Sequence, residues 1–176
     1  MDKIDAEILN NLQVNGRITN SELAKRVGLS APSVLERVRK LEESGVISGY
    51  SARINPDKVG RGTTCFVAVS LALHQQDSIK SFKQEIDDIP EVLECFHITG
   101  EEDYLLRVTV RDMQHYRDLL LNRLTKIPGL SKLKTMVVLS QIKIKTELEV
   151  DPSALDQEGN NRIRGRNNRK RGSKSK

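Results

Sequence analysis

The chain has 176 residues, of which 37% are hydrophobic and 30% are charged, and its formal net charge is +5. This length suits two small domains or one medium domain with modest hydrophobic cores. No apolar run approaches the roughly 18 residues of a membrane-spanning helix, and no charged-then-apolar leader follows Met1, so neither a membrane span nor a signal peptide is expected. We therefore expect a cytoplasmic protein.

The first 54 residues predict three helices followed by a small β wing. Residues 2–15 have apolar positions at helical spacing, and Thr19 stands three residues before Glu22, as in a capping box that starts a second helix near residue 20. Gly28 permits the left-handed turn that ends this helix, and Ser30 caps the next one. Residues 45–54 then predict a strand pair around Gly49. Three helices and a wing in this order are typical of a winged helix-turn-helix, although an αα-hairpin with a charged outer face would give the same helix pair.

The third helix, residues 30–43, is basic on the face opposite its apolar stripe. Such a helix, held at a fixed angle by a preceding helix and a short turn, fits the DNA major groove. Arginine can donate two hydrogen bonds to guanine O6 and N7, so Arg37 is the first candidate for reading bases, and Ser33 is expected near base edges or phosphate. The remaining candidates are expected to contact phosphates, which position the protein without reading sequence. They are Ser30, Lys25, Arg26, Arg39, Lys40 and Arg53.

Residues 55–62 combine Pro, Asp and Gly without an apolar period and predict a linker. The next elements are a strand at 63–74, a helix at 78–88, strands at 92–99 and 104–110, a helix at 113–126 and a strand at 133–145. This doubled β-α-β unit predicts an α+β, ferredoxin-like βαββαβ domain with helices on one face of an antiparallel sheet. Because the first strand is apolar on both faces, we expect a second subunit to cover the other face.

Residues 2–146 resemble the Lrp/AsnC family of prokaryotic transcription regulators, the feast/famine proteins. The resemblance rests on IDAEILNNLQVNGRITNSELAKRVGLS, VLERVRKLEESGVISGY, TGEEDYLLRV, and IPGL followed by VVLSQIK. It implies a DNA-binding domain at residues 1–54, a linker at 55–62 and an effector-binding and oligomerisation domain at 63–150. The basic tail at residues 151–176 departs from the family pattern. The resemblance also implies association with the nucleoid and homodimers that assemble further, commonly into octamers.

The connection at residues 100–103 is the candidate ligand site. Asp103 could pair with the ammonium of an amino acid, while backbone N–H groups beside Gly100 hold its carboxylate, although an ordinary solvated hairpin turn has the same composition. The resemblance implies an amino-acid pocket lined by Gly100, Asp103 and Tyr104, with Thr99, Ser140 and Gln141 as further members.

No metal site, cofactor or catalysis is expected. Cys65 and Cys95 lie in apolar strand patterns without a CxxC motif and predict two buried thiols, and His74, His97 and His115 are scattered. The sequence also lacks a Ser/His/Asp set, a phosphate-binding glycine loop and paired catalytic carboxylates.

Residues 153–176 hold eight Lys and Arg against two Asp and Glu, so they supply most of the net positive charge. Almost no apolar residue is present, and we expect this tail to be disordered and to add salt-sensitive phosphate contacts. A solubilising tail or a remnant of cloning would have the same composition.

The leading hypothesis is a homo-oligomeric, sequence-specific transcription regulator that binds double-stranded DNA and responds to a small amino acid. A rival is an architectural protein of the same fold, in which oligomers wrap DNA without an effector. An amino-acid-metabolising enzyme with a ferredoxin-like regulatory domain is a third possibility, and the absence of catalytic residues opposes it.

Overall fold

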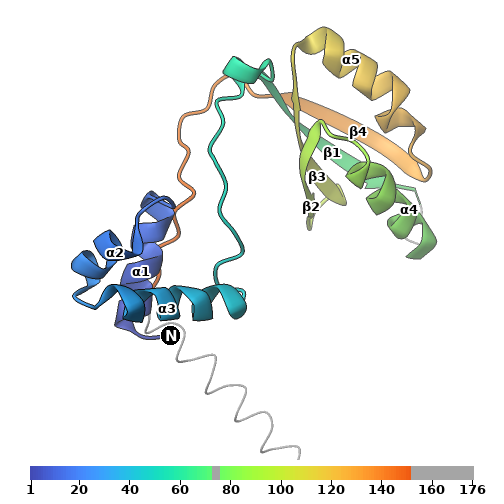
Figure 1. Cartoon of the computed structure of the whole chain (residues 1–176). Coiled ribbons are helices and arrows are strands. Elements are labelled where there is room, and N and C mark those ends of the chain that lie inside the picture. Colours follow the sequence, from blue (N-terminus) through green and yellow to red (C-terminus); the bar gives the residue numbers. More distant parts are fainter. Residues whose placement is uncertain (73–75, 152–176) are drawn as a thin grey trace, which may run out of the picture. The chain divides into compact units, whose positions relative to one another are not determined.

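The computed structural model describes residues 1–72 and 76–151, which fall into two compact units (Figure 1). The second unit is Arg53–Lys143. The first comprises Met1–Ala52 and the segment that starts at Ile144. The described residues 144–150 therefore belong with the N-terminal helices, whereas the sequence placed them in the C-terminal domain. Residues 73–75, with His74, and the predicted tail beyond residue 151 lie outside the described residues.

The first unit contains α1 (Lys3–Val14), α2 (Asn20–Val27) and α3 (Ala31–Glu43). Each helix starts at a side-chain cap, and Asp2 and Asp5 form a complete capping box on α1. Gly28 has a φ of 70°, which is the left-handed conformation that ends α2 and turns the chain toward α3. The three helices enclose one apolar core, made of Ile8, Leu9, Ile18, Leu23, Ala24, Val27, Val34, Val38 and Leu41.

The strand pair predicted at residues 45–54 is not formed, because these residues contain no strand. The chain instead folds back on the end of α3, where the N–H of Ile47 donates to the carbonyl of Leu41 at 3.0 Å. Tyr50 Oη donates to Glu42 Oε1 on α3 at 2.9 Å. The segment after α3 therefore packs on its own helix rather than on a second strand.

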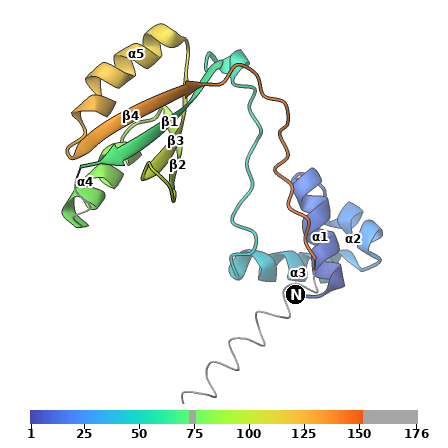
Figure 2. The ribbon, with the colours of Figure 1, turned by 180° about the vertical axis from the view of Figure 1, so that it is seen from behind.

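The second unit is a four-stranded antiparallel sheet with two helices on one face. The sheet consists of β1 (Thr63–Leu71), β2 (Val92–His97), β3 (Tyr104–Val110) and β4 (Leu130–Val137) in the order β2-β3-β1-β4. Figure 2 shows α4 (Gln76–Asp87) and α5 (Met113–Asn122) on the same side of the sheet. Short 3-10 turns are formed at Asp57–Val59, within the predicted linker, and at Leu124–Lys126. The predicted α+β, ferredoxin-like fold is confirmed.

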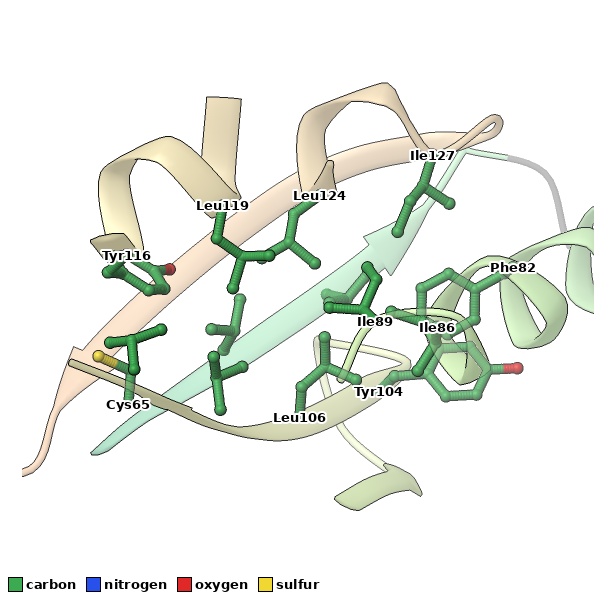
Figure 3. Close-up of a cluster of buried hydrophobic side chains, with 14 of the residues drawn as sticks. Cys65, Phe82, Ile86, Ile89, Tyr104, Leu106, Tyr116, Leu119, Leu124 and Ile127 are labelled. Carbon is green, nitrogen blue, oxygen red and sulfur yellow. The ribbon is translucent and has the colours of Figure 1, made fainter. Parts of the chain in front are cut away.

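The core of this unit lies between the helices and the sheet (Figure 3). Phe82 and Ile86 of α4 approach Tyr104 and Leu106 of β3, while Tyr116 and Leu119 lie over the other end of the sheet. Alternate residues of β1 point into the core, because side chains of a strand project to opposite faces in turn. The other face of the described sheet carries none of the helices.

The last strand is shorter and earlier than the predicted range of 133–145. Gly129, with a φ of 79°, starts β4 at Leu130, and Val137 pairs with Cys65 close to the start of β1. The N–H of Val138 still donates to the Thr64 carbonyl at 2.9 Å. Beyond that point β1 offers no further partner, so the chain leaves the sheet.

The predicted burial of two thiols is half right. Cys65 is buried beneath α5, as expected, and burial raises the pKa of its thiol. Cys95 is exposed, which contradicts the prediction, because β2 is an edge strand with a neighbouring strand on one side only. Both are free thiols, and β3 separates their strands. None of the helices within the described residues is long and apolar enough to cross a membrane.

Candidate functional site

The angle between α2 and α3 is fixed by local hydrogen bonds and by the core beneath them. Thr19 Oγ1 accepts from the N–H of Glu22 at 3.2 Å, and the N–H of Leu29 donates to the Ala24 carbonyl at 3.0 Å across the turn. Leu23 of α2 and Val34 of α3 are both completely buried. The outer face of α3 is therefore presented in one orientation, as groove binding requires.

The outer face of α3 carries exposed cations that pair weakly with acids of the same helix. Arg39 lies 3.4 Å from Glu36 and 3.5 Å from Glu43, while Lys40 lies 3.5 Å from Glu36. Exposed pairs of this kind contribute about 0.3–0.5 kcal/mol each, so a phosphate can replace the glutamates at little cost. Arg39 and Lys40 are thus exposed on α3, and their contact with phosphates stays a prediction.

Arg37 lies at the edge of this face and reaches across to α1. Its Nη1 donates to Asp2 Oδ2 at 2.8 Å and to Asp5 Oδ1 at 2.6 Å, and its side chain is 31% exposed. The bonds to Asp5 and Asp2 raise the pKa of Arg37, and the N–H of Asp5 together with Arg37 lowers the pKa of Asp2. The sequence did not predict this triad, although two aspartates in the first turn of α1 are the signal for it.

The other predicted DNA contacts are more dispersed. Ser30 caps α3 and its hydroxyl bonds to that of Ser33 at 2.8 Å. Arg26 bonds to Glu22 at 2.8 Å and to Asn11 of α1 at 3.0 Å, and its neighbour Lys25 is exposed. Arg53 belongs to the second compact unit.

Sequence reasoning missed Leu35, which is 55% exposed on the outer face of α3. The buried stripe of α3 consists of Val34, Val38 and Leu41, and Leu35 lies outside it. This helical spacing could have predicted from the sequence that Leu35 is exposed. An exposed aliphatic side chain on a reading helix can contact the methyl group of thymine. A groove of about 810 Å³ runs beside this face and is lined in part by Arg37, Ser33 and Lys40.

Tyr50 provides a pH-dependent contact beside α3. Burial and the hydrogen bond to Glu42 raise its pKa to about 12. The unfolded phenol ionises near pH ~10, so the stabilisation is fully present below about pH 10 and is lost as pH rises to about 12.

We expect the melting temperature of the intact protein to exceed that of Tyr50→Phe at about pH 9 and to approach it at about pH 12. Tyr50 is 53% exposed. Solvent screening should therefore keep the effect below about 1 kcal/mol. Thermal melts of both proteins across this pH range provide the measurement, and a difference that stays constant with pH would contradict the assignment.

The predicted ligand loop joins β2 to β3, and much of it is engaged within the protein. The Asp103 N–H donates to the Val69 carbonyl at 2.9 Å, and Asp103 Oδ2 accepts from the N–H of Leu71 at 2.8 Å. Tyr104 is only 4% exposed, with its ring stacked on His97 and tilted against Phe82. Asp103 therefore ties the loop to the end of β1, and Tyr104 is a core residue rather than an open pocket wall.

Two other members of the predicted pocket are not on a strand. Ser140 and Gln141 are exposed and follow the end of β4, so the expectation that they line the last strand is wrong. Thr99 and Gly100 remain exposed in the loop, and Gly100 has a φ of 135°, which favours glycine.

Glu102 is the unexpected member of this loop. Its Oε1 is buried, lies 4.0 Å from both Lys132 Nζ and Lys134 Nζ, and has no hydrogen-bond partner among the described residues. A buried carboxylate oxygen without a donor is energetically costly, and an ammonium group supplies the missing donors. The sequence shows three adjacent acids here but gives no sign of which one has a buried oxygen without a donor.

Two family models match the chain. The one described as the Lrp/AsnC ligand binding domain matches residues 64–148, and the one described as winged helix-turn-helix DNA-binding matches residues 1–48. The leucine-responsive regulatory protein of Escherichia coli (strain K12) is 41% identical over 150 residues, which are 85% of this chain and 92% of that protein.

Solved structures agree with these matches. A transcriptional regulator of Neisseria meningitidis, determined as a complex with L-Met, is 38% identical with a TM-score of 0.81, covering 84% of this chain and 96% of that chain. An AsnC family transcriptional regulator from Agrobacterium tumefaciens is 36% identical with a TM-score of 0.80, at 84% and 96% coverage.

Proposed function

Because this chain belongs to the Lrp/AsnC family of transcription regulators, we propose that it binds specific DNA sequences as a homo-oligomer and that a small amino acid tunes this binding. Of these proposed properties, DNA binding by the helix-turn-helix has direct support from the family membership. We place the protein in the cytoplasm, on the nucleoid.

The observation that carries the proposal for base reading is the fixed position of Arg37 at the edge of α3. Asp2 and Asp5 both hold Nη1, and within the described residues Nε and Nη2 have no partner. The Nε and Nη2 hydrogens form one edge of the guanidinium, which matches the O6 and N7 acceptors of guanine. The aspartates thus hold the arginine ready for a base, so less side-chain freedom is lost on binding.

Phosphate contacts surround this reader in the proposed complex. Ser30, Ser33, Arg39 and Lys40 come from α3 and its cap, and Lys25 and Arg26 come from α2. Arg53 is proposed as a further phosphate contact. Each phosphate neutralised by a cation releases counterions, so binding should weaken steeply as salt increases.

We propose that two subunits pack through the face of the sheet that α4 and α5 leave uncovered. Phe96, Leu105 and Ala68 lie in register across three strands of this face, and Phe66 pairs with Met136 in the next row. Phe96 is 47% exposed and Met136 is 41% exposed in the single chain. A symmetric dimer would place two reading helices on two half-sites, and further association of dimers would give an octamer.

The proposed effector is an aliphatic amino acid such as leucine or methionine, bound at the loop between β2 and β3. Glu102 would accept hydrogen bonds from its ammonium group, and the backbone at Gly100, with Thr99 beside it, would hold its carboxylate. Asp103 keeps the loop closed on β1, and Tyr104 supports it from the core. Ser140 and Gln141 remain proposed contacts, since residues beyond β4 are exposed.

A thermal-melt screen against the proteinogenic amino acids tests the effector. An amino acid at about 100 times its Kd should stabilise the protein by about 2.7 kcal/mol, which raises Tm by several degrees. We expect Glu102→Gln to abolish this rise, because a neutral amide no longer pairs with the ammonium. Its matched control is Glu101→Gln at the exposed neighbouring position, which should keep the rise.

The architectural function is retained as the second candidate, and one observation favours it. Asp103 and Tyr104, both predicted to contact an amino acid, are engaged by Leu71 and by the core. If no proteinogenic amino acid at millimolar concentration changes Tm, the effector is excluded and the architectural function is preferred.

Gel shifts on the DNA upstream of the protein's own gene, with an unrelated duplex as competitor, test the proposal as a whole. The expected result is retention of the upstream complex at a competitor excess that removes non-specific binding. Equal competition by the two duplexes would contradict sequence-specific regulation.

A further inference from the structure

Residues 55–61, which the sequence assigned to a linker, form a closed turn at the start of the second unit. Asn55 Oδ1 accepts from the N–H of Asp57 at 3.0 Å. The N–H of Arg61 donates to the Pro56 carbonyl at 2.8 Å and closes the turn. Most of the predicted linker is therefore folded rather than extended.

The side chain of Arg61 joins this turn to the sheet. Its Nη1 donates to the Thr109 carbonyl of β3 at 3.3 Å and lies 3.5 Å from Glu91 Oε1. Glu91 directly precedes β2, and its carbonyl accepts from the N–H of Thr109 at 2.9 Å. The Glu91 side chain is only 15% exposed. Arg61 therefore contacts two groups that the sheet holds in place.

His115 of α5 also contacts the Glu91 carboxylate. His115 Nε2 lies 3.3 Å from Glu91 Oε1. The N–H of Arg111 donates to His115 Nδ1 at 3.4 Å, so the hydrogen of the neutral ring lies on Nε2, toward Glu91. The backbone N–H of His115 is held by the cap Asp112 at 2.7 Å. We call Arg61, Glu91 and His115 the linker anchor.

The chain passes between the two units twice, and the passage that ends at the anchor is the shorter. Residues 51–54 alone separate Tyr50, which bonds to α3, from the closed turn. In the second passage, residues 139–147 lead from the end of the sheet to Leu148. Gln13 of α1 holds Leu148, donating to its carbonyl at 2.8 Å and accepting from its N–H at 2.7 Å. The first passage therefore limits how far the DNA-binding unit can move from the sheet.

We propose that the linker anchor sets the half-site spacing that a dimer can bind, because it keeps the shorter passage short. The inference rests on the proposed function, in which two subunits place two reading helices on one operator. Arg61 and Glu91 act as positioning residues and do not touch DNA themselves. Without the anchor, residues 55–61 can extend by up to about 24 Å, since an extended chain gains about 3.4 Å per residue.

Operators with altered spacers test this role. About 2 base pairs inserted between the half-sites move one of them by about 7 Å along the axis and about 70° around it. This displacement lies within the reach of the released chain. We expect the unmodified protein to lose affinity by about tenfold or more on the insertion, because one reading helix loses its half-site. Arg61→Ala and Glu91→Gln should lose about threefold or less.

Three controls separate positioning from a general effect on binding. On a duplex with a single half-site, both variants should bind as the unmodified protein does, because α3 is untouched. The double variant Arg61→Ala/Glu91→Gln should have the same spacer response as either single variant, because the two residues act as one contact. Asp118→Asn removes the acid of an exposed pair with Arg117 on α5 and should keep the full loss on insertion.

Melting temperature and mass identify a variant that has lost its fold or its dimer. Arg61→Ala changes a residue outside the helices and strands, so it decides the result if Glu91→Gln unfolds. A folded variant that kept the full loss on insertion would overturn the proposal. Equal affinity of the unmodified protein for both spacers would also overturn it. Failure of the unmodified protein to bind any operator would instead refute the proposed function.

Discussion

Arg37→Ala is expected to lose roughly tenfold to a hundredfold in preference for its operator over unrelated DNA, because one bidentate arginine–guanine contact discriminates by about 1–3 kcal/mol. Binding to unrelated DNA should fall much less, since the phosphate contacts remain. Competition binding with operator and unrelated duplexes at one fixed salt concentration measures both quantities. Footprinting of the same variant shows which base pairs lose protection.

The triad with Asp2 and Asp5 makes a second variant informative. Asp5→Asn removes the carboxylate closest to Nη1, at 2.6 Å, while leaving Arg37 in place. If the aspartates hold the guanidinium for base reading, Asp5→Asn should lower operator preference in the same direction as Arg37→Ala, but by less. Lys40→Ala is the phosphate-binding control and should weaken binding evenly across sequences while reducing the salt slope by about 1.

The outcome that would contradict this role is a lower melting temperature for Arg37→Ala with unchanged operator preference. Arg37 would then only join α1 to α3, and Leu35 and Lys40, two exposed side chains of α3, would become the leading candidates for base contact.

Leu105→Glu is expected to convert the oligomer to monomers and to reduce operator affinity by more than tenfold. Leu105 lies on the helix-free face between Phe96 and Ala68, so a carboxylate there would be buried without a partner at the proposed interface. A monomer reaches one half-site only, so it lacks the avidity of two linked reading helices. Light scattering combined with size-exclusion chromatography gives the mass, and fluorescence anisotropy gives the affinity.

The control for Leu105→Glu is Leu121→Glu, which places the same charge at an apolar position of α5 that is 56% exposed. It should leave both mass and affinity unchanged. If Leu105→Glu stayed oligomeric, the sheet face would not be the interface, and the charged residues within its rows would explain why. Glu94 and Arg107 form two hydrogen bonds of 2.7 and 2.9 Å there, and Lys132 and Lys134 lie on β4.

The helix-turn-helix was predictable because each of its signals is local. Thr19, Gly28 and Ser30 act within one turn of their own position, and the structure has the two caps and the left-handed glycine where the sequence predicted them. The apolar stripe of α3 follows from the helical period alone. The β-α-β repeat was predictable for the same reason, since periods of 2 and 3.6 distinguish its strands from its helices.

The errors have a common origin in contacts between residues far apart in the chain. The end of β4 depends on where β1 begins. Val137 pairs with Cys65 near the start of β1, so Ser140 and Gln141 have no strand to pair with. Cys95 was predicted to be buried, but it is exposed because β2 lies at the edge of the sheet and has only one neighbouring strand. The apolar residues after Gly45 fit either a strand pair or a segment that packs on α3. The structure has the second arrangement, in which Ile47 and Tyr50 bond to α3.

The sequence alone therefore determined the helices and the four strands of the sheet, the turn that orients α3, and the family to which these elements belong. Tertiary structure alone decided that Asp2 and Asp5 hold Arg37, that the Oε1 atom of Glu102 is buried, and that Gln13 bonds to the backbone of Leu148. The physical reason is that caps and periodicity depend on neighbours within a few residues. The burial of a carboxylate or the partner of an amide depends on which distant segment the folded chain brings against it.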